Sequence, residues 1–293
     1  MAAEWKSPGD WNLLTLKTIL SMRLNMAAEP RRIHPAMYIA GVVVILLGVY
    51  AQYVLNIGTV GSFLLAYGLP LAVVRALWWD GIAGNALRNN TSALRYGLAY
   101  YGIFTAIGII GSLAVVYALT ALDPSAVGLL QQPNPVLNVP PDVALVMVFV
   151  SILVVGPAEE VLFRGFVFGG LVSLTGGRHW VAMAFASSVL FAMAHLYYAL
   201  VYGIASAVPF VELVAFAMAM AAAFHFSGGN LLVPAMIHGV YDASGFIGVA
   251  VSLDVGTALR IGMLILGLIF AVTFSRQGKF PTGDQGTSPS THV

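Results

Sequence analysis

Long apolar runs dominate the sequence and are separated by short segments rich in Gly, Pro and charged residues. Several runs reach about 18 residues or more, which is enough for a helix to cross a hydrocarbon core of roughly 30 Å. The runs lack the alternation of apolar and polar positions that marks barrel strands, so each must satisfy its backbone hydrogen bonds as a helix. The pattern predicts an all-α polytopic integral membrane protein with about eight transmembrane helices.

The punctuating Gly, Pro and charged residues set the expected ends of these helices. The predicted spans are 35–57, 61–79, 96–122, 142–174, 180–203, 204–226, 231–253 and 258–274. The fourth is longer than one perpendicular crossing needs, so we expect it to tilt, to project past the bilayer, or to kink near Gly156 and Pro157. The transmembrane domain as a whole is expected to cover residues 35–276.

The segment before the first span, residues 1–34, has a different character. Its apolar stretch is interrupted by Lys17 and Arg23, which is not the pattern of a cleaved signal peptide. We interpret it as an amphipathic arm at the membrane interface, anchored by Trp5 and Trp11. A soluble N-terminal extension is the alternative.

The distribution of Lys and Arg predicts the orientation, because these residues favour the cytoplasmic side of short flanking segments. Eight crossings with cytoplasmic N- and C-termini in the cell membrane place most of the basic residues inside: Lys6, Lys17, Arg23, Arg31, Arg32, Arg75, Arg88, Arg95, Arg178, Arg276 and Lys279. Only Arg260 falls on the other side, while the connection 123–141 has no basic residue and suits the outer face. The tail 277–293, rich in Gly, Ser, Thr and Pro, is expected to be disordered.

Composition supports the bilayer as the solvent of this chain. Apolar residues make up 59% of the sequence and charged residues 9%, whereas soluble domains carry about 25% charged residues. The absence of cysteine excludes disulfides, thiolate catalysis and Cys-ligated metals. The net charge of +1 gives no reason to expect a nucleic-acid partner.

Ionisable residues inside the spans are the candidates for function, because each costs about 2.5–3.5 kcal/mol at the centre of a helix on insertion scales. They are Glu159, Glu160, Arg164, His195, Glu212, His238 and Asp242. All but Glu212 are concentrated in three spans, which indicates a site. We interpret Glu212 as an inter-helix contact, and a position on the wall of a cavity is the alternative.

The first cluster is the sequence Glu159-Glu160-Val-Leu-Phe-Arg164. Glu160 and Arg164 are one helical turn apart, with the acid in the favourable N-terminal position for an ion pair. Glu159 is rotated by about 100° from Glu160 and cannot share that geometry equally, which leaves its carboxylate available for chemistry. In the alternative interpretation both acids share Arg164 as a packing clamp.

The other two clusters are Phe191-x-x-x-His195 and His238-x-x-x-Asp242. A single histidine among apolar residues is more often hydrogen-bonded to a neighbouring helix than catalytic. His238 and Asp242 lie on one helix face and could converge on a ligand, a metal or a developing charge. Pairing within the core is again the alternative.

Together these side chains are those of a hydrolase. A carboxylate in a low-dielectric site can act as the base for water, and imidazole can donate to the oxyanion of a tetrahedral intermediate. Alternatively, Glu159, His195 and His238 could bind a divalent metal such as zinc, which would polarise the carbonyl and acidify its water. The residues leave both mechanisms open, one with a metal and one with no cofactor.

The ordered motifs E-E-x-x-x-R, F-x-x-x-H and H-x-x-x-D resemble those of the CPBP family of intramembrane proteases, which includes the type II CAAX prenyl endopeptidases. The resemblance covers about 142–253, the expected catalytic core. It implies a membrane endopeptidase that acts on a peptide or a prenylated protein near its C-terminus. It also implies a glutamate-dependent hydrolase, usually labelled a metalloprotease.

The resemblance implies a role for each motif residue. Glu159 with His195 would hold and activate water, and Glu160 with Arg164 would orient the site. His238 and Asp242 would stabilise the oxyanion. Prenyl endopeptidases typically have Asn at the last position; an ionised Asp242 cannot donate a hydrogen bond, so it must be protonated, orient His238 or bind metal.

Span counting places these residues between mid-bilayer and the cytoplasmic half, so substrate is expected to enter from that side or laterally. Two other classes compete with the protease. A proton-coupled carrier also uses intramembrane Glu, His and Asp, although the paired broken helices of carriers are not evident. A non-catalytic membrane scaffold or immunity protein is the second alternative.

Overall fold

The computed structural model describes residues 33–55, 57–83, 91–177 and 179–278. Within these ranges every regular element is a helix, which confirms the all-α prediction. The amphipathic helix predicted in the arm 1–34 lies outside the described residues, apart from its last two positions. Most of the predicted disordered tail 277–293 lies outside them as well.

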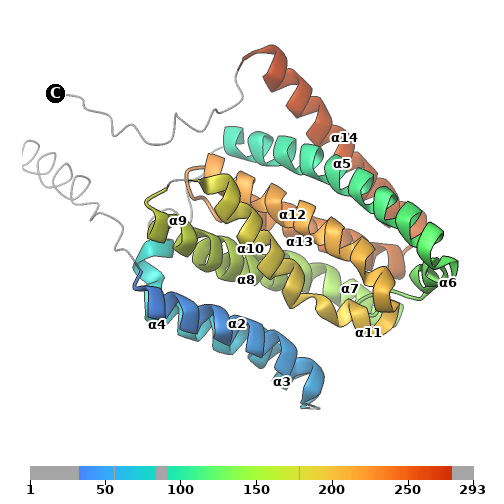
Figure 1. The fold of residues 1–293 in the computed structure, drawn as a ribbon, viewed down its shortest axis with the longest axis horizontal. Coiled ribbons are helices and arrows are strands. Elements are labelled where there is room, and N and C mark those ends of the chain that lie inside the picture. Colours follow the sequence, from blue (N-terminus) through green and yellow to red (C-terminus); the bar gives the residue numbers. More distant parts are fainter. Residues whose placement is uncertain (1–32, 56, 84–90, 178, 279–293) are drawn as a thin grey trace, which may run out of the picture.

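The elements follow one another as a bundle of long helices with short helical connections (Figure 1). They are α2 (Pro35–Val54), α3 (Gly58–Phe63), η2 (Leu64–Gly68), α4 (Leu69–Ala83), α5 (Thr91–Leu122), α6 (Pro124–Gly128), η3 (Leu129–Gln131), α7 (Pro141–Val150), η4 (Ser151–Val155), α8 (Gly156–Glu160), η5 (Val161–Phe168), α9 (Gly169–Thr175), α10 (Trp180–Ala194), η6 (Leu196–Tyr198), α11 (Ala199–Tyr202), η7 (Gly203–Ser206), α12 (Ala207–Phe226), α13 (Leu232–Ala250) and α14 (Leu253–Arg276).

Seven helical segments among the described residues are long and apolar enough to cross a membrane. An eighth apolar helix, α10, is shorter and ends at Ala194, whereas the predicted span extended to residue 203. The segment between Leu196 and Ser206 instead forms three short helical turns, and Gly203 within it has a positive φ of 52°. The predicted boundary between the fifth and sixth spans is therefore wrong in position.

Helix α12 lies at the centre of the bundle and packs against α5, α10 and α13. Its sequence from Ala215 to Ala223 is buried and consists mostly of alanine and methionine. Small side chains let helix backbones approach closely where lipid gives no hydrophobic drive for association. The core of this protein is therefore built around an alanine-rich helix.

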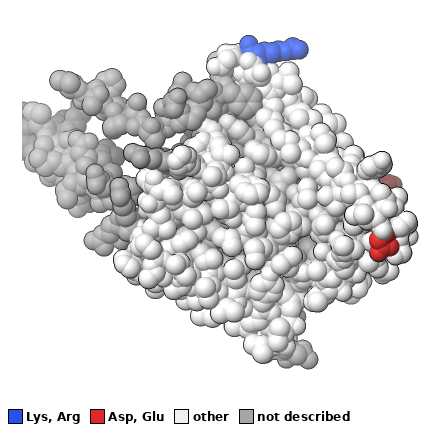
Figure 2. Space-filling view, viewed as in Figure 1, with Lys and Arg blue, Asp and Glu red and all other residues white. Residues whose placement is uncertain are grey.

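The outer surface is apolar, as expected of a protein in a bilayer. Large side chains such as Leu47, Ile110 and Leu153 are more than 60% exposed. Figure 2 shows one face, on which charged side chains occur only at the margins of the described surface. The faces of these helices are thus suited to lipid contact.

Two ends of the bundle can be distinguished in Figure 1. The terminal end is where α2 begins and α14 ends. The α11 end, opposite to it, carries α3, α6 and α11.

Candidate active site

The two motif glutamates close the short helix α8, which lies between the π-helical segments η4 and η5. Pro157 has no backbone N–H to donate within the helix, so the normal hydrogen-bond ladder is interrupted there. Wide π turns of this kind are frequent at functional sites. The predicted irregularity near Gly156 and Pro157 thus takes the form of flanking π turns within one continuous span.

Close contact between α8 and α13 places the first motif beside the third. A Cβ added to Gly156 would lie 2.8 Å from the backbone nitrogen of Gly239, and one added to Gly239 would lie 2.8 Å from the Cα of Ile152. Only glycine permits this approach of the two backbones. His238, adjacent to Gly239, is thereby held against the glutamates.

Glu160 is the centre of a buried ionic cluster. Its Oε1 lies 3.0 Å from Nη1 of Arg164, as predicted from their spacing, and 2.6 Å from Nδ1 of His238. All three side chains are almost completely buried. Because a carboxylate oxygen only accepts hydrogen bonds, Nδ1 of His238 donates to an ionised Glu160.

Phe191 connects this cluster to the second motif. The guanidinium of Arg164 lies over its ring at 4.7 Å from the centroid, and Nη2 of Arg164 is 3.4 Å from the carbonyl oxygen of Ala217. The ring centroids of Phe191 and His195 are 4.6 Å apart. The aromatic position of the second motif is therefore a packing partner of the buried arginine.

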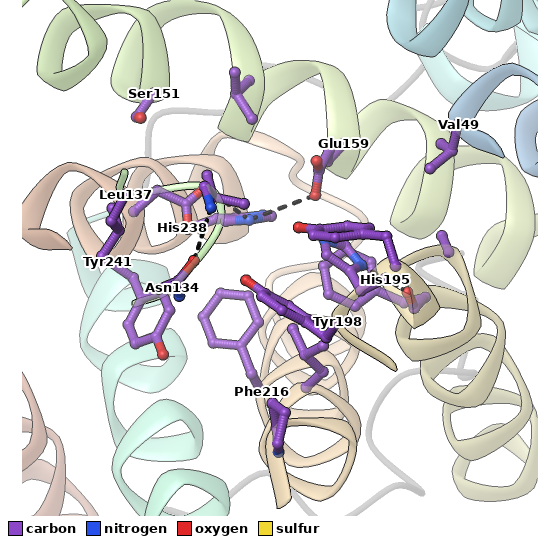
Figure 3. A pocket seen from close by; sticks show the side chains of 18 of the residues that line it. Val49, Asn134, Leu137, Ser151, Glu159, His195, Tyr198, Phe216, His238 and Tyr241 are labelled. Carbon is purple, nitrogen blue, oxygen red and sulfur yellow. Dashed lines mark hydrogen bonds and ion pairs between the residues drawn. The ribbon is translucent and has the colours of Figure 1, made fainter. Parts of the chain in front are cut away.

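Glu159 forms no ion pair with Arg164, and its side chain faces a cavity (Figure 3). Its Oε1 accepts a hydrogen bond of 2.9 Å from the hydroxyl of Tyr67, and its Oε2 lies 3.7 Å from Nε2 of His238. The expectation that the two glutamates have different surroundings is confirmed. Tyr67 was not predicted, since a tyrosine within a span gives no signal that it contacts a catalytic carboxylate.

His195 follows the last residue of α10 and lines the same cavity. Its Nδ1 is 2.9 Å from the carbonyl oxygen of Phe191, which can only accept, so Nδ1 carries a proton. In the neutral imidazole Nε2 is then an acceptor. No hydrogen bond or ion pair joins His195 to Glu159 in the described structure, so a shared water between them stays a prediction.

Asp242 is the most exposed of the motif acids, with 29% of its side chain accessible, and its Oδ2 lies 3.4 Å from Nε2 of His238. Of the three roles considered from the sequence, this contact favours the orientation of His238. His238 thus has carboxylates on both sides of its ring, from Glu160 at Nδ1 and from Glu159 and Asp242 near Nε2.

The cavity has a volume of about 480 Å³. Its polar lining includes Tyr67, Glu159, His195, Glu212, Asp242 and Arg260. Glu212 lines the cavity and also contacts Ser112 of α5, so both interpretations drawn from the sequence hold. Apolar side chains such as Phe63, Met147 and Phe246 supply much of the remaining wall.

The cavity occupies the half of the bundle near the α11 end. It is lined by Tyr53 near the end of α2, Pro209 near the start of α12, Arg260 near the start of α14 and Tyr198 in η6. If the termini are cytoplasmic, a cavity near the α11 end lies toward the outer half, and both the orientation and the depth of the site stay predictions. Helix α10 ends at Ala194, so His195 lies at a helix end and not within the predicted span.

The fit of a metal to these residues can be judged from the donor set. Within the described ranges no three His, Asp or Glu side chains are grouped so that they could hold a metal ion. Nδ1 of His238 contacts Glu160 and Nδ1 of His195 contacts a backbone carbonyl, which leaves Nε2 of each ring as the nitrogen that a metal could bind. Because Glu159, His195 and His238 are not grouped as three ligands in this arrangement, the metal site considered from the sequence stays a prediction.

Comparison with known proteins agrees with the three motifs. Residues 141–244, fewer than half of the chain, match the family model described as "Type II CAAX prenyl endopeptidase Rce1-like". The matched segment runs from the start of α7 into α13 and contains all three motifs. Searches of curated proteins and of solved structures find no match.

The helical bundle and this match define a CAAX-type intramembrane protease in the broad sense. Over these residues the chain is similar to the type II CAAX prenyl endopeptidases, in agreement with the ordered motifs. Its general activity is that of a hydrolase acting on a membrane-associated peptide or protein.

Proposed function

We propose that this protein is an intramembrane endopeptidase that uses Glu159 as the general base for a hydrolytic water. The observation that carries the proposal is the position of the Glu159 carboxylate on the wall of a cavity within a membrane bundle, apart from the buried Arg164. A base must have its oxygen accessible to the water it deprotonates. Glu160, which is completely buried, does not meet that requirement.

In this mechanism the water lies between Glu159 and His195. The hydrogen bond from Tyr67 fixes one oxygen of Glu159 and leaves the other to accept a proton. Nε2 of His195 accepts the second hydrogen bond of the water, because its Nδ1 is held by a backbone carbonyl. Attack on the scissile carbonyl then moves one proton to Glu159, which returns it to the leaving amine.

His238 stands where the oxyanion would form. Its Nε2 lies 3.7 Å from Glu159 and 3.4 Å from Asp242, both longer than a hydrogen bond, so a closer acceptor can be accommodated. Glu160 and Asp242 orient the ring. Arg164 balances the charge of Glu160 beneath it.

The proposed substrate is a membrane-associated peptide cleaved near its C-terminus, with a prenylated cysteine as one candidate group at the cleavage site. The cavity volume lies within the range of about 300–1,000 Å³ that is usual for small-molecule pockets. Its apolar wall suits a lipid chain, since each buried methylene contributes about 0.8 kcal/mol.

The test is cleavage of internally quenched peptides, with and without a farnesylated cysteine, by the purified protein in detergent. We expect Glu159→Gln to reduce the rate at least about a hundredfold, because the amide cannot act as a base. Asp142→Asn is the matched control: it removes an exposed carboxylate from the same span, outside the cavity, and should leave the rate unchanged. Equal rates for wild type and Glu159→Gln would rule out this mechanism.

A chelator titration in the same assay separates the two accounts of water activation. Activity that survives EDTA and o-phenanthroline supports the glutamate alone, whereas activity lost with chelator and restored by added zinc supports a metal. Absence of cleavage by wild type across all peptides would favour the carrier or scaffold interpretation.

A further inference from the structure

Arg260 is a cation on the cavity wall that lies outside all three motifs and beyond the segment matched to the family. It belongs to α14 and reaches across to α13, where its Nε donates to the hydroxyl of Ser244 at 2.8 Å. Its guanidinium also lies over the ring of Tyr241, 4.7 Å from the centroid. These contacts fix the side chain in one orientation.

The backbone of α13 makes room for this arginine. A Cβ added to Gly245 would lie 2.8 Å from Nη2 of Arg260 and 3.2 Å from a methyl group of Leu137. Glycine at this position therefore lets the guanidinium lie against the helix. The arrangement is a built site and not a solvated surface charge.

Arg260 is in no direct ion pair within the described part of the chain, although Glu212 is near enough for its charge to interact with the guanidinium. Glu212 and Asp242 line the same cavity. Of its five N–H donors only the one at Nε has a hydrogen-bond partner there. An arginine inside a membrane protein normally pairs with an anion, so the free donors indicate a site for an anionic group of a ligand.

The distance from the reaction centre suggests which anion this is. Ser244 lies six residues after His238 on the same helix, a rise of about 9 Å at about 1.5 Å per residue. Three extended residues span about 10 Å. A C-terminal C-a-a-X sequence has three residues after its prenylated cysteine, so its terminal carboxylate would reach Arg260 when the bond after the cysteine is at His238.

We propose that Arg260 binds the C-terminal α-carboxylate of the substrate and so determines where the protease cuts. The inference rests on the proposed endopeptidase function. The planar guanidinium group of Arg260 presents donors that match a carboxylate, while Ser244 and Tyr241 hold this group toward the cavity. Arg260 is a specificity residue, and the distance between it and His238 sets the number of residues released.

The experiment compares two peptides that differ only at the C-terminus, one with a free carboxylate and one with an amide. Wild type should cleave the acid with a kcat/KM at least about tenfold higher than that of the amide, as expected for a charge-assisted hydrogen bond. In Arg260→Gln the ratio of kcat/KM for the acid to kcat/KM for the amide should fall to about one. In Arg260→Lys this ratio should lie between that value and the wild-type ratio. Arg276→Gln removes the same charge from the exposed end of the same helix and should keep the wild-type ratio.

Lengthening the peptide gives a second arm. One or two residues added after the three that follow the cysteine should lower kcat/KM for cleavage of the bond after the cysteine in wild type. The same additions should not lower it in Arg260→Gln. An acid-to-amide ratio near one in wild type, or a wild-type ratio in Arg260→Gln, would overturn the proposal whether or not the variant is less stable.

A binding arm separates the failure of this proposal from the failure of the proposed function. Stabilisation of the wild-type protein against heat is measured with a tripeptide acid and its amide, which requires no cleavage. Stronger stabilisation by the acid, lost in Arg260→Gln, supports the carboxylate site even if no peptide is cleaved. The acid and the amide could instead stabilise the protein equally while Arg260→Gln loses bound anionic phospholipid. That result would assign the site to a lipid headgroup and overturn the proposed carboxylate site.

Discussion

Nδ1 of His238 lies 2.6 Å from Oε1 of Glu160, and this contact joins the third motif to the first inside the bundle. The same oxygen lies 3.0 Å from Nη1 of Arg164, so one carboxylate oxygen serves a histidine and an arginine. The other oxygen, Oε2, has no hydrogen-bond partner among the described atoms. Glu160 is therefore a structural anion whose loss would leave a buried cation unpaired.

We predict that Glu160→Ala destabilises the protein by about 3–5 kcal/mol, the usual cost of removing one partner of a buried ion pair. Thermal unfolding in detergent, followed by circular dichroism, measures the loss. Glu159→Ala is the comparison, because Glu159 makes no ion pair with Arg164 and its side chain faces the cavity. Similar unfolding temperatures for the two variants would contradict the separate roles given to the adjacent glutamates.

Tyr67→Phe tests how the base is oriented. The substitution removes only the hydroxyl that donates to Oε1 of Glu159 at 2.9 Å. A hydrogen bond to a charged group contributes about 1.5–3 kcal/mol, so we expect kcat to fall by about tenfold or more. Tyr117→Phe, on an exposed side chain of α5, is the matched control and should leave kcat unchanged. A wild-type kcat in Tyr67→Phe would show that the hydroxyl does not position the base.

The close approach of α8 and α13 leads to a third prediction. Gly239→Ala places a methyl group 2.8 Å from the Cα of Ile152, so the two helices must separate and His238 must move from the glutamates. We expect loss of cleavage together with a lower unfolding temperature. Gly262→Ala makes the same change in α14 where no atom lies within 4 Å, and it should retain both properties. If the two variants have the same cleavage rate and unfolding temperature, the close approach of α8 and α13 is not required for activity or stability.

The sequence predicted the helical class and the contacts within single motifs, because both depend on local spacing. Glu160 and Arg164 pair as their separation of one turn requires, and the rotation between Glu159 and Glu160 gives them different surroundings. The contact of Glu160 with His238 was not predicted. It depends on the approach of Gly156 to Gly239, which joins positions far apart in the chain.

Other parts of the site left no local signal. Tyr67 belongs to a span in which aromatic residues are common, and only the packing of α2 and α4 against η5, which follows α8, shows that it reaches Glu159. Arg260 was interpreted as a charge on the unfavourable side near a helix end. Its hydrogen bond to Ser244 crosses between two helices, so no periodicity within α14 could reveal it.

The last prediction concerns the side of the membrane on which the cavity lies. The cavity is near the α11 end, opposite to the start of α2 and the end of α14. Arg95 near the start of α5 and Arg276 at the end of α14 lie toward the terminal end, as does Arg75 late in the span Val60–Trp78. Arg260, near the start of α14, lies toward the α11 end, and Arg164 is buried inside the bundle. The positive-inside rule therefore predicts that the terminal end is cytoplasmic and that the cavity faces the outer half.

Single cysteines can test this orientation because the natural chain contains none. Gln132→Cys places an exposed thiol beside η3 at the α11 end, and Gln277→Cys places one just after α14 at the terminal end. In intact cells we expect a membrane-impermeant maleimide to label Cys at position 132 and to reach position 277 only after lysis. That result would direct the search for substrates to peptides exposed outside the cytoplasm. Labelling of position 277 alone would place the cavity on the cytoplasmic side, where prenylated proteins are made, and would show that the basic residues do not determine the topology of this chain.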